Sequence, residues 1–191
     1  MKKLVCIDAS IRSSGCSIYD YETERTFLYS YTSKIKKDLR FSIDKFDVFI
    51  ESQKKADKNE DYFREYMRIS DKIFGRLMEQ KIDNTNTAVA FEGYAFAGKG
   101  KTFSIGEFGG LLKRHFYNNN MSLTEIPPKQ WKMFIANNGN AKKDAIYKTM
   151  LNCELKSVLA EFVVNGYTYK EGSWIEDICD VYSIQKYVLA I

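Results

Sequence analysis

Two short apolar segments of this chain each end in a single carboxylate, and this pattern constrains the fold more than any other feature. The first segment is Val5-Cys6-Ile7-Asp8, and the second is Ala88-Val89-Ala90-Phe91-Glu92. Runs of this length and composition are typical of buried β-strands. A carboxylate at the end of a buried strand is costly unless a cation compensates its charge. The chain is therefore expected to form a sheet with Asp8 and Glu92 at strand ends, within reach of a cation.

Two further aspartates, Asp177 and Asp180, lie three residues apart near the start of the last predicted helix. Side chains at this spacing face the same way, and the helix dipole favours negative charge there by about 0.3–1 kcal/mol. If the strands that end in Asp8 and Glu92 are neighbours, these four carboxylates can meet outside the strand ends. Taken singly, each is explained as well by a turn, a salt bridge or a solvated helix surface, so the prediction depends on all four together.

The remaining apolar patterns predict alternating strands and helices, which is typical of a mixed α/β fold. Period-two or short apolar patterns predict strands at residues 4–7, 16–21, 26–32, 88–92 and 123–126. Three- and four-residue spacing predicts helices at residues 63–77, 106–117, 129–136 and 142–151. Pro128 is expected to be the first residue of the third helix.

Four segments carry weaker signals. Ser13-Ser14-Gly15 has the composition of a turn, and residues 34–59 are charged and predicted to be helical or irregular. Residues 158–169 are β-rich in composition and predicted to form an insertion outside the core sheet. Ser173-Trp174-Ile175-Glu176 has the spacing of a capping box, which predicts the start of a helix that continues to residue 191.

Composition limits the class of protein. The chain has 191 residues, of which 45% are hydrophobic, and this is typical of one globular domain. No apolar run is long enough for a transmembrane helix or a signal peptide, so we expect a cytoplasmic protein with no membrane partner. The four cysteines form no C-x-x-C pair, which favours reduced core residues over a disulfide or a zinc site.

Basic residues are concentrated in the segment 92–150. It contains nine lysine and arginine residues against four acidic ones, whereas the net charge of the whole chain is only +4. Such an excess favours a phosphate backbone as partner, although solvated lysines on a helix give the same count. Within the segment, a glycine-rich loop carries Lys99 and Lys101. The aromatics Tyr94 and Phe96 precede this loop, and they could stack on an exposed base or equally pack in the core.

The four carboxylates offer only oxygen ligands, which suit magnesium or manganese and do not suit zinc. Two such ions about 3.5–4 Å apart activate water and stabilise the leaving 3′ oxygen of an in-line phosphodiester displacement. A nearby lysine would neutralise charge on the scissile phosphate. Lys142 and Lys143 follow a glycine-containing loop, and Lys132 lies eleven residues before Lys143. These residues predict a metal-dependent phosphodiesterase that acts on nucleic acid.

In this order, the short motifs resemble the RuvC-type Holliday junction resolvases of the ribonuclease H-like superfamily. The matching pieces are Ile7-Asp8-Ala9-Ser10 with Gly15 following, Ala90-Phe91-Glu92, Pro128-Lys129-Gln130-Trp131-Lys132, Gly139-Asn140-Ala141-Lys142-Lys143 and Asp177-Ile178-Cys179-Asp180. The divergent sequence is more similar to bacteriophage or poxvirus members than to the typical bacterial enzyme. The resemblance implies an α/β, ribonuclease H-like fold, a mixed β-sheet flanked by helices, with residues 1–191 as one nuclease domain.

The resemblance also implies roles for individual residues. The four carboxylates Asp8, Glu92, Asp177 and Asp180 would bind two magnesium ions, with manganese as a substitute. Lys143 would contact the scissile phosphate, with Lys132 at the matching spacing. Because Lys142 is adjacent to Lys143, either of the two could take that part.

Partners follow from the same resemblance. Such enzymes act as homodimers that nick two opposed strands of a four-way DNA junction. The helix at residues 106–117 would lie at the dimer interface, although its apolar residues could equally face the chain's own core. An aromatic shortly after the glutamate, Tyr94 or Phe96, would insert at the junction.

Together these implications predict a magnesium-dependent crossover junction endodeoxyribonuclease that resolves four-way and other branched DNA junctions by paired nicks. One alternative is a ribonuclease H-type hydrolase of RNA–DNA hybrids, which uses the same carboxylates on the same fold. Another is a junction-binding protein without catalysis, which would need the acidic set to be broken. A sugar-kinase-like ATPase shares an early strand that ends in aspartate. Its second glycine-rich phosphate loop is not evident in the sequence, and the chain is too short for two lobes.

Overall fold

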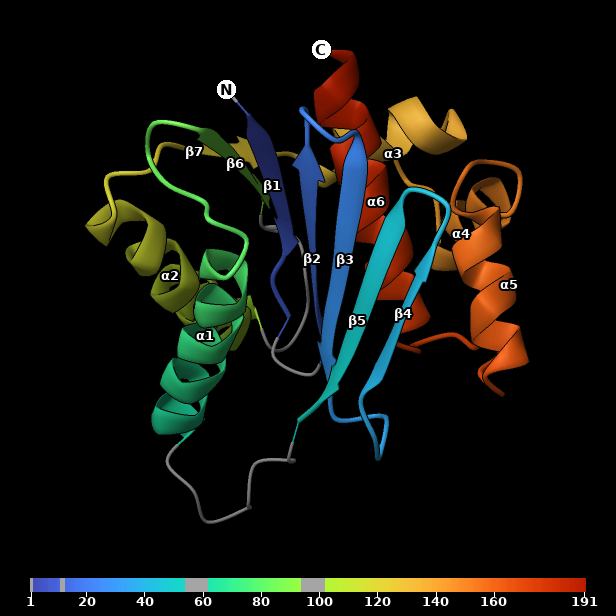
Figure 1. Ribbon diagram of the computed structural model, residues 1–191, viewed down its shortest axis with the longest axis horizontal. Coiled ribbons are helices and arrows are strands. Elements are labelled where there is room, and N and C mark those ends of the chain that lie inside the picture. Colours follow the sequence, from blue (N-terminus) through green and yellow to red (C-terminus); the bar gives the residue numbers. More distant parts are fainter. Residues whose placement is uncertain (1, 11–12, 54–61, 94–101) are drawn as a thin grey trace.

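Strand β1 (Lys3–Asp8) contributes side chains to two separate hydrophobic cores. The computed structural model describes residues 2–10, 13–53, 62–93 and 102–191 (Figure 1). Leu4 and Cys6 pack in one core, whereas Val5 and Ile7 pack in the other. Successive side chains of a strand point to opposite faces of a sheet. Because all four side chains are buried, helices must cover both faces of the sheet around β1.

The sheet has seven strands in the order β4-β5-β3-β2-β1-β6-β7. The other strands are β2 (Ser13–Asp20), β3 (Arg25–Thr32), β4 (Leu39–Ile43), β5 (Phe46–Ser52), β6 (Thr87–Glu92) and β7 (Leu123–Ile126). β1 pairs antiparallel with β2 and parallel with β6, while β3 pairs antiparallel with β2 and parallel with β5. β7 is parallel to β6, and β4 is antiparallel to β5. Strands β1, β3, β5, β6 and β7 therefore all end at the same edge of the sheet, which we call the carboxyl edge.

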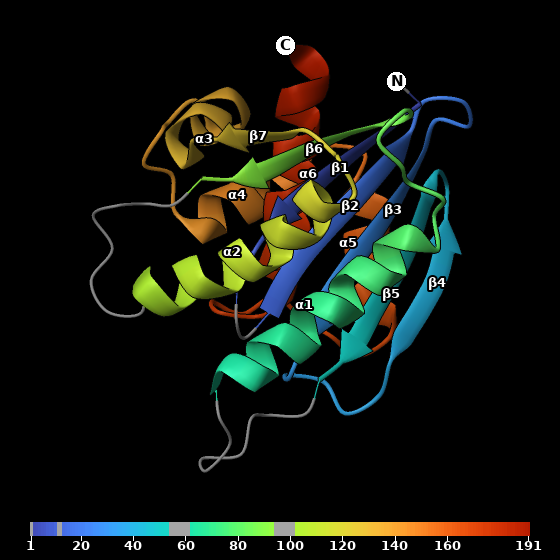
Figure 2. The same ribbon diagram turned by 90° about the vertical axis from the view of Figure 1, so that its left-hand side faces the viewer.

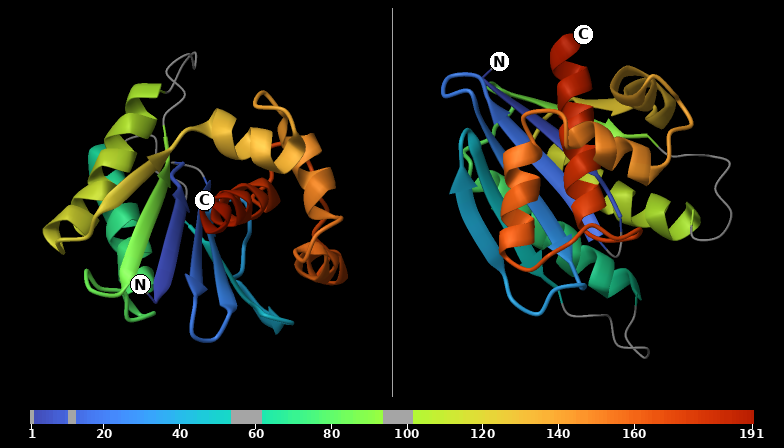
Figure 3. Two further views of the ribbon diagram at one scale, coloured as in Figure 1. Left: turned by 90° about the horizontal axis from the view of Figure 1, so that it is seen from above. Right: turned by 90° about the vertical axis from the view of Figure 1, so that its right-hand side faces the viewer.

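Helices cover the two faces unequally (Figures 2 and 3). One face carries α1 (Tyr62–Met78) and α2 (Thr102–Asn118), and the other carries α3 (Pro128–Ala136), α4 (Lys143–Met150), α5 (Lys156–Val164) and α6 (Ile175–Ala190). In the described part of the chain, no helix combines the length and apolarity that a membrane span requires. All four cysteines are free thiols, as predicted, and three of them are buried.

The structure confirms most of the predicted elements. Strands β1, β3, β6 and β7 and helices α1 to α4 lie where the apolar patterns predict them. Pro128 is the first residue of α3, as predicted. The N–H of a first helical residue has no acceptor within the helix, so proline loses no hydrogen bond at this position. The mixed sheet with helices on both faces confirms the predicted fold class.

Residues 34–59 were predicted to be helical or irregular, and this prediction is wrong for the described part of the segment. It contains β4 and β5, which extend the sheet beyond β3. Phe46, Val48 and Ile50 alternate with less buried residues along β5 and enter one core. This alternation is the period of a strand, but the charged residues around it obscured the signal.

Residues 158–169 were predicted to form a β-rich insertion, but most of this segment belongs to α5 or follows it. Val158, Leu159 and Phe162 are buried in the core that α6 shares, and this burial overrides the low helix propensity of β-branched residues. Ser13-Ser14-Gly15 was predicted to be a turn, and it opens β2 instead, paired with the end of β3.

The predicted capping box before α6 is also wrong. The helix begins at Ile175 with Trp174 as its N-cap, and no side chain caps its first N–H groups. Glu176 accepts a hydrogen bond from the Gly172 N–H at 2.8 Å, and the Ser173 hydroxyl is buried without a partner among the described residues. The Glu176 carboxylate therefore stabilises the loop before α6 and does not cap the first turn of the helix.

Candidate active site

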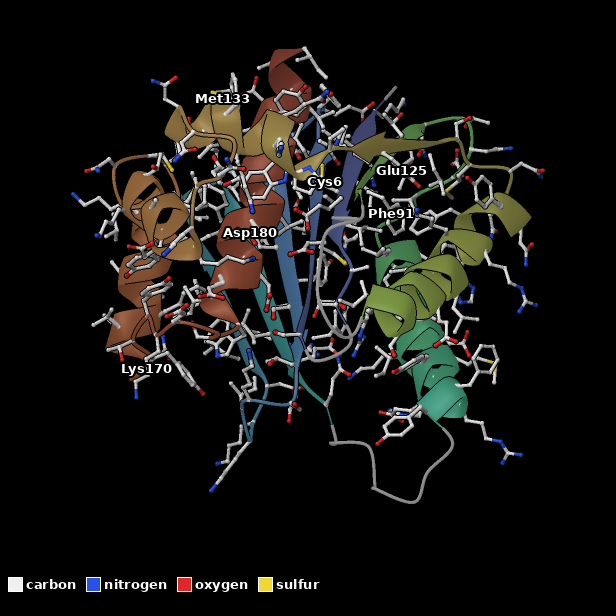
Figure 4. All side chains as sticks on the ribbon, turned by 180° about the vertical axis from the view of Figure 1, so that it is seen from behind. Cys6, Phe91, Glu125, Met133, Lys170 and Asp180 are labelled. Carbon is white, nitrogen blue, oxygen red and sulfur yellow. The ribbon has the colours of Figure 1, made fainter. Side chains whose placement is uncertain are left out.

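The carboxyl edge of the sheet brings the predicted acidic residues together. Asp8 ends β1 and Glu92 ends β6, and these strands are parallel neighbours. Asp177 and Asp180 lie in the first two turns of α6, which packs against β1 and β2. Figure 4 labels Asp180 on this helix, in front of the strands. Asp8, Asp177 and Asp180 are buried and Glu92 is partly buried, so the four carboxylates are largely shielded from water.

Asp8 is the member that links the strand carboxylates to the helix carboxylates. Burial raises the pKa of Glu92 well above its usual range, and the negative charge of Asp8 raises it further. Burial likewise raises the pKa of Asp177 to about 8, again with Asp8 as the next contribution. Like charges in a shared, poorly hydrated site disfavour full ionisation. Burial and the charge of Asp8 therefore both disfavour the ionised forms of Glu92 and Asp177.

Among the described residues, Lys143 is the basic residue that forms an ion pair with this cluster. Its ammonium group forms an ion pair with Asp180, while 39% of its side chain stays exposed. Its positive charge also partly offsets the increase in pKa at Glu92 and Asp177. The adjacent Lys142 is exposed and is the N-cap of α4. Of the two neighbouring lysines, Lys143 is thus the one in contact with the carboxylates.

Lys132 lies beside Trp131, and its predicted contact with DNA stays a prediction. Its Nζ lies 5.3 Å from the centre of the Trp131 ring, within the range of a cation–π contact. The remaining predicted DNA-contact residues lie outside the described residues: Tyr94, Phe96, Lys99 and Lys101. Their assignment stays a prediction.

Three residues complete the site without having been singled out for it. The Trp131 indole N–H donates a hydrogen bond to Glu92 Oε1 at 3.1 Å, and the ring is fully buried. The Ser13 hydroxyl donates to Asp177 Oδ2. Gly15 lies opposite Asp8 in the pairing of β1 with β2, and a Cβ atom on it would lie 2.5 Å from the Asp177 carbonyl oxygen.

Two of these residues carried a signal in the sequence. A buried tryptophan needs an acceptor for its N–H, which makes Trp131 a candidate partner for a buried carboxylate. A glycine inside a strand often marks the close approach of another backbone, as Gly15 does here for the start of α6. Ser13 carried no comparable signal.

Replacing Trp131 by phenylalanine should destabilise the protein. The variant Trp131→Phe leaves Glu92 Oε1 without its indole donor, and an unsatisfied buried polar group costs about 1–3 kcal/mol. Trp174→Phe is the matched control, because it also shrinks a buried indole but removes no hydrogen bond to a described residue. Denaturant-induced unfolding measures both. Equal losses of unfolding free energy would mean that the Glu92 hydrogen bond contributes nothing beyond packing.

The donor set suits a divalent metal ion in chemistry and in charge. All of its ligating atoms are carboxylate oxygens, which magnesium and manganese prefer. Asp180 Oδ1 is buried and has no hydrogen-bond partner among the described residues, so one oxygen in the cluster is open to a cation. Within the described ranges, however, no three histidine, cysteine, aspartate or glutamate side chains are arranged around one point as metal ligands.

The predicted dimer helix has its apolar residues in the interior of its own chain. Phe108, Leu112 and Phe116 of α2 are fully buried in the core that α2 shares with α1. This is the alternative that the sequence left open for these residues. A dimer interface on this helix would have to use its remaining face, and the homodimer stays a prediction.

Comparison with solved structures identifies the fold. No protein-family model and no curated protein matches the chain. The structure of Thermus thermophilus RuvC matches 98% of this chain and 95% of its own chain, with a TM-score of 0.57 and 12% sequence identity. RuvC of the same organism in complex with a Holliday junction substrate matches 99% and 95%, with a TM-score of 0.58 and 14% identity. The chain therefore has a RuvC-like fold, the ribonuclease H-like mixed sheet flanked by helices that its sequence predicts.

Proposed function

We propose that this protein is a structure-selective endodeoxyribonuclease that resolves four-way DNA junctions by paired nicks. The proposal is supported by three contacts at the carboxyl edge: Asp8 acts on Glu92 and on Asp177, and Lys143 forms an ion pair with Asp180. The carboxylates come from two adjacent strands and one helix, and they lie on a RuvC-like fold. One of the matching RuvC structures contains a Holliday junction substrate, which supports branched DNA as the substrate class.

In the proposed enzyme, Asp8, Glu92, Asp177 and Asp180 would hold two magnesium ions. When bound, these ions would activate water and stabilise the leaving oxygen of the cleaved phosphodiester. Exposure of 39% of its side chain leaves Lys143 accessible to a phosphate of the DNA, whose charge it would offset.

Hydrogen bonds from the protein pre-position two of the carboxylates. Trp131 donates to Glu92 and Ser13 donates to Asp177, so both acceptors are held before any substrate binds. Such support matters because a small misplacement of a catalytic group costs a large part of its effect. Paired nicks on opposed strands need two sites, and we propose that two copies of the chain supply them as a homodimer.

Cleavage of matched substrates tests the proposal. The substrates are an end-labelled four-way junction, a linear duplex of one arm and an RNA–DNA hybrid of the same sequence, each with Mg²⁺, Mn²⁺, Ca²⁺ or EDTA. We expect paired nicks in the junction with Mg²⁺ or Mn²⁺, binding without cleavage with Ca²⁺, and no cleavage with EDTA. Preferential cleavage of the hybrid would favour a ribonuclease H-type hydrolase. Junction binding without cleavage in every metal would favour a non-catalytic binding protein.

A further inference from the structure

A lysine-rich loop lies at the same edge of the sheet as the four carboxylates. Residues 33–38 connect the end of β3 to the start of β4, and we call this segment the β3–β4 loop (Figure 1). β3 runs parallel to β1 and is separated from it only by β2. Neighbouring strands lie about 4.7–4.9 Å apart, so Ser30, which is level with Asp8 across β2, lies roughly 10 Å from it, and β3 ends two residues further on at Thr32. The loop therefore begins close to the proposed catalytic site.

Buried contacts hold the β3–β4 loop in place. Ile35 is buried, and its carbonyl oxygen accepts a hydrogen bond from the Ser52 hydroxyl at 2.8 Å. The Ser52 N–H donates to Asp38 Oδ1, also at 2.8 Å. The middle and the last residue of the loop are thus tied to the end of β5. Little additional ordering is needed for the loop to present its side chains to a ligand.

Lys34 connects this loop directly to the candidate active site. Its ammonium group donates a hydrogen bond to the Gly172 carbonyl, in the segment just before α6. Its positive charge also lowers the pKa of Asp177, against the larger increase caused by burial. Lys34 therefore lies close enough to the carboxylates to act on one of them.

The two other lysines of the loop face solvent. Lys36 and Lys37 are exposed, and neither forms an ion pair within the described residues. The one acidic residue of the loop, Asp38, already accepts the hydrogen bond from Ser52. A phosphate recurs every 3.4 Å of axial rise on one DNA strand, and the helical rotation makes the spacing between successive phosphates larger, so a span of roughly 10 Å reaches about one to two phosphates further along the strand. A strand with one phosphate at the carboxylates can place its next phosphates over Lys36 and Lys37.

We propose that the β3–β4 loop is a second contact for the DNA backbone, through Lys36 and Lys37, beside the catalytic site. The proposal rests on the proposed function, because it assumes that DNA occupies the four carboxylates. The loop would bind phosphates without reading sequence, and it would increase affinity rather than the rate of the chemical step. It also assigns a role to part of the segment that adds β4 and β5 to the sheet.

The test compares two double variants that lose the same number of charges. Lys36→Ala with Lys37→Ala removes the proposed contact. Lys2→Ala with Lys81→Ala is the matched control, because both lysines are exposed and lie at the opposite edge of the sheet. Binding of the four-way junction is measured by fluorescence anisotropy in Ca²⁺. The salt concentration is varied between about 50 and 200 mM, because affinity from phosphate contacts falls steeply over this range. Single-turnover cleavage with Mg²⁺ at saturating protein is measured in parallel.

We expect the loop variant to bind roughly tenfold more weakly at the lowest salt. Its slope of log affinity against log salt should be smaller by up to about 1.8, or about 0.9 for each lost phosphate contact. The control should bind as wild type does, and all three proteins should cleave at the same saturated rate. A loop variant with the affinity and slope of wild type overturns the loop proposal, while wild-type cleavage still supports the proposed function. A wild-type protein that binds no junction overturns both.

Discussion

The variant Asp8→Asn should abolish junction cleavage and, at the same time, stabilise the metal-free protein. Asp8 is a proposed metal ligand, and loss of one such group is expected to slow cleavage by roughly 10³-fold or more. Its negative charge also raises the pKa of both Glu92 and Asp177, because all three carboxylates lie in a poorly hydrated cluster. Removing that charge should relieve repulsion once Glu92 and Asp177 ionise, so the stabilisation should be clearest above the Asp177 pKa of about 8. Single-turnover cleavage with Mg²⁺ and thermal unfolding in EDTA measure the two effects.

Asp144→Asn is the control for this prediction. Asp144 lies next to Lys143 on α4, but its side chain is exposed and pairs with Lys148 one turn later. Loss of such a surface pair should change stability by less than about 0.5 kcal/mol and leave cleavage unaffected. If Asp8→Asn cleaves as fast as wild type, Asp8 is not a ligand of the catalytic metal. If its unfolding temperature without metal is unchanged or lower, the carboxylates do not repel each other as proposed.

Gly15→Ala should both destabilise the protein and impair cleavage. The new Cβ would lie 2.5 Å from the carbonyl oxygen of Asp177 and 3.0 Å from its carbonyl carbon. Both are backbone atoms of the first turn of α6, so either the helix or β2 must move. Overpacking of this kind costs about 1–3 kcal/mol. Displacement of Asp177 by about 1 Å should reduce cleavage by roughly 10²-fold.

A second glycine provides a control with the opposite sign. Gly75 lies in the last turn of α1, and outside its own helix backbone no atom lies within 4 Å of the position of its Cβ. Gly75→Ala should therefore stabilise the protein by up to about 1 kcal/mol through helix propensity, with no change in cleavage. Denaturant-induced unfolding measures the stability of both variants, and single-turnover cleavage measures their activity. If Gly15→Ala has the stability and the cleavage rate of wild type, the position of α6 does not require a glycine at residue 15.

Local pattern was sufficient to predict the part of the site that lies on the strands. Asp8 and Glu92 each end a short apolar run, and parallel pairing of two such strands necessarily brings their ends together. The helix pair Asp177 and Asp180 was less predictable, because two aspartates three apart on a helix usually face solvent. Their place depended on the resemblance, and the structure puts Asp177 near Asp8 and Asp180 against Lys143.

Contacts between distant segments could not be predicted. The hydrogen bond from Trp131 to Glu92 spans 39 residues of sequence, and the bond from Ser13 to Asp177 spans 164. No local pattern specifies such a pair, because its geometry depends on how α3 and α6 pack on the sheet. The parallel pairing of β5 with β3 was also missed, because the charged residues of this segment hid the strand pattern of the β4–β5 hairpin.

The contact between the beginning of β2 and the start of α6 has a consequence for protein synthesis. A nascent chain carries Asp8 and Glu92 long before the ribosome has added Asp177 and Asp180. The carboxylate cluster therefore cannot assemble until Asp177 and Asp180 have been added, and closing so long a loop is slow compared with forming local contacts. The proposed nuclease would therefore be inactive in partly synthesised chains, because two of its four proposed metal ligands lie on α6.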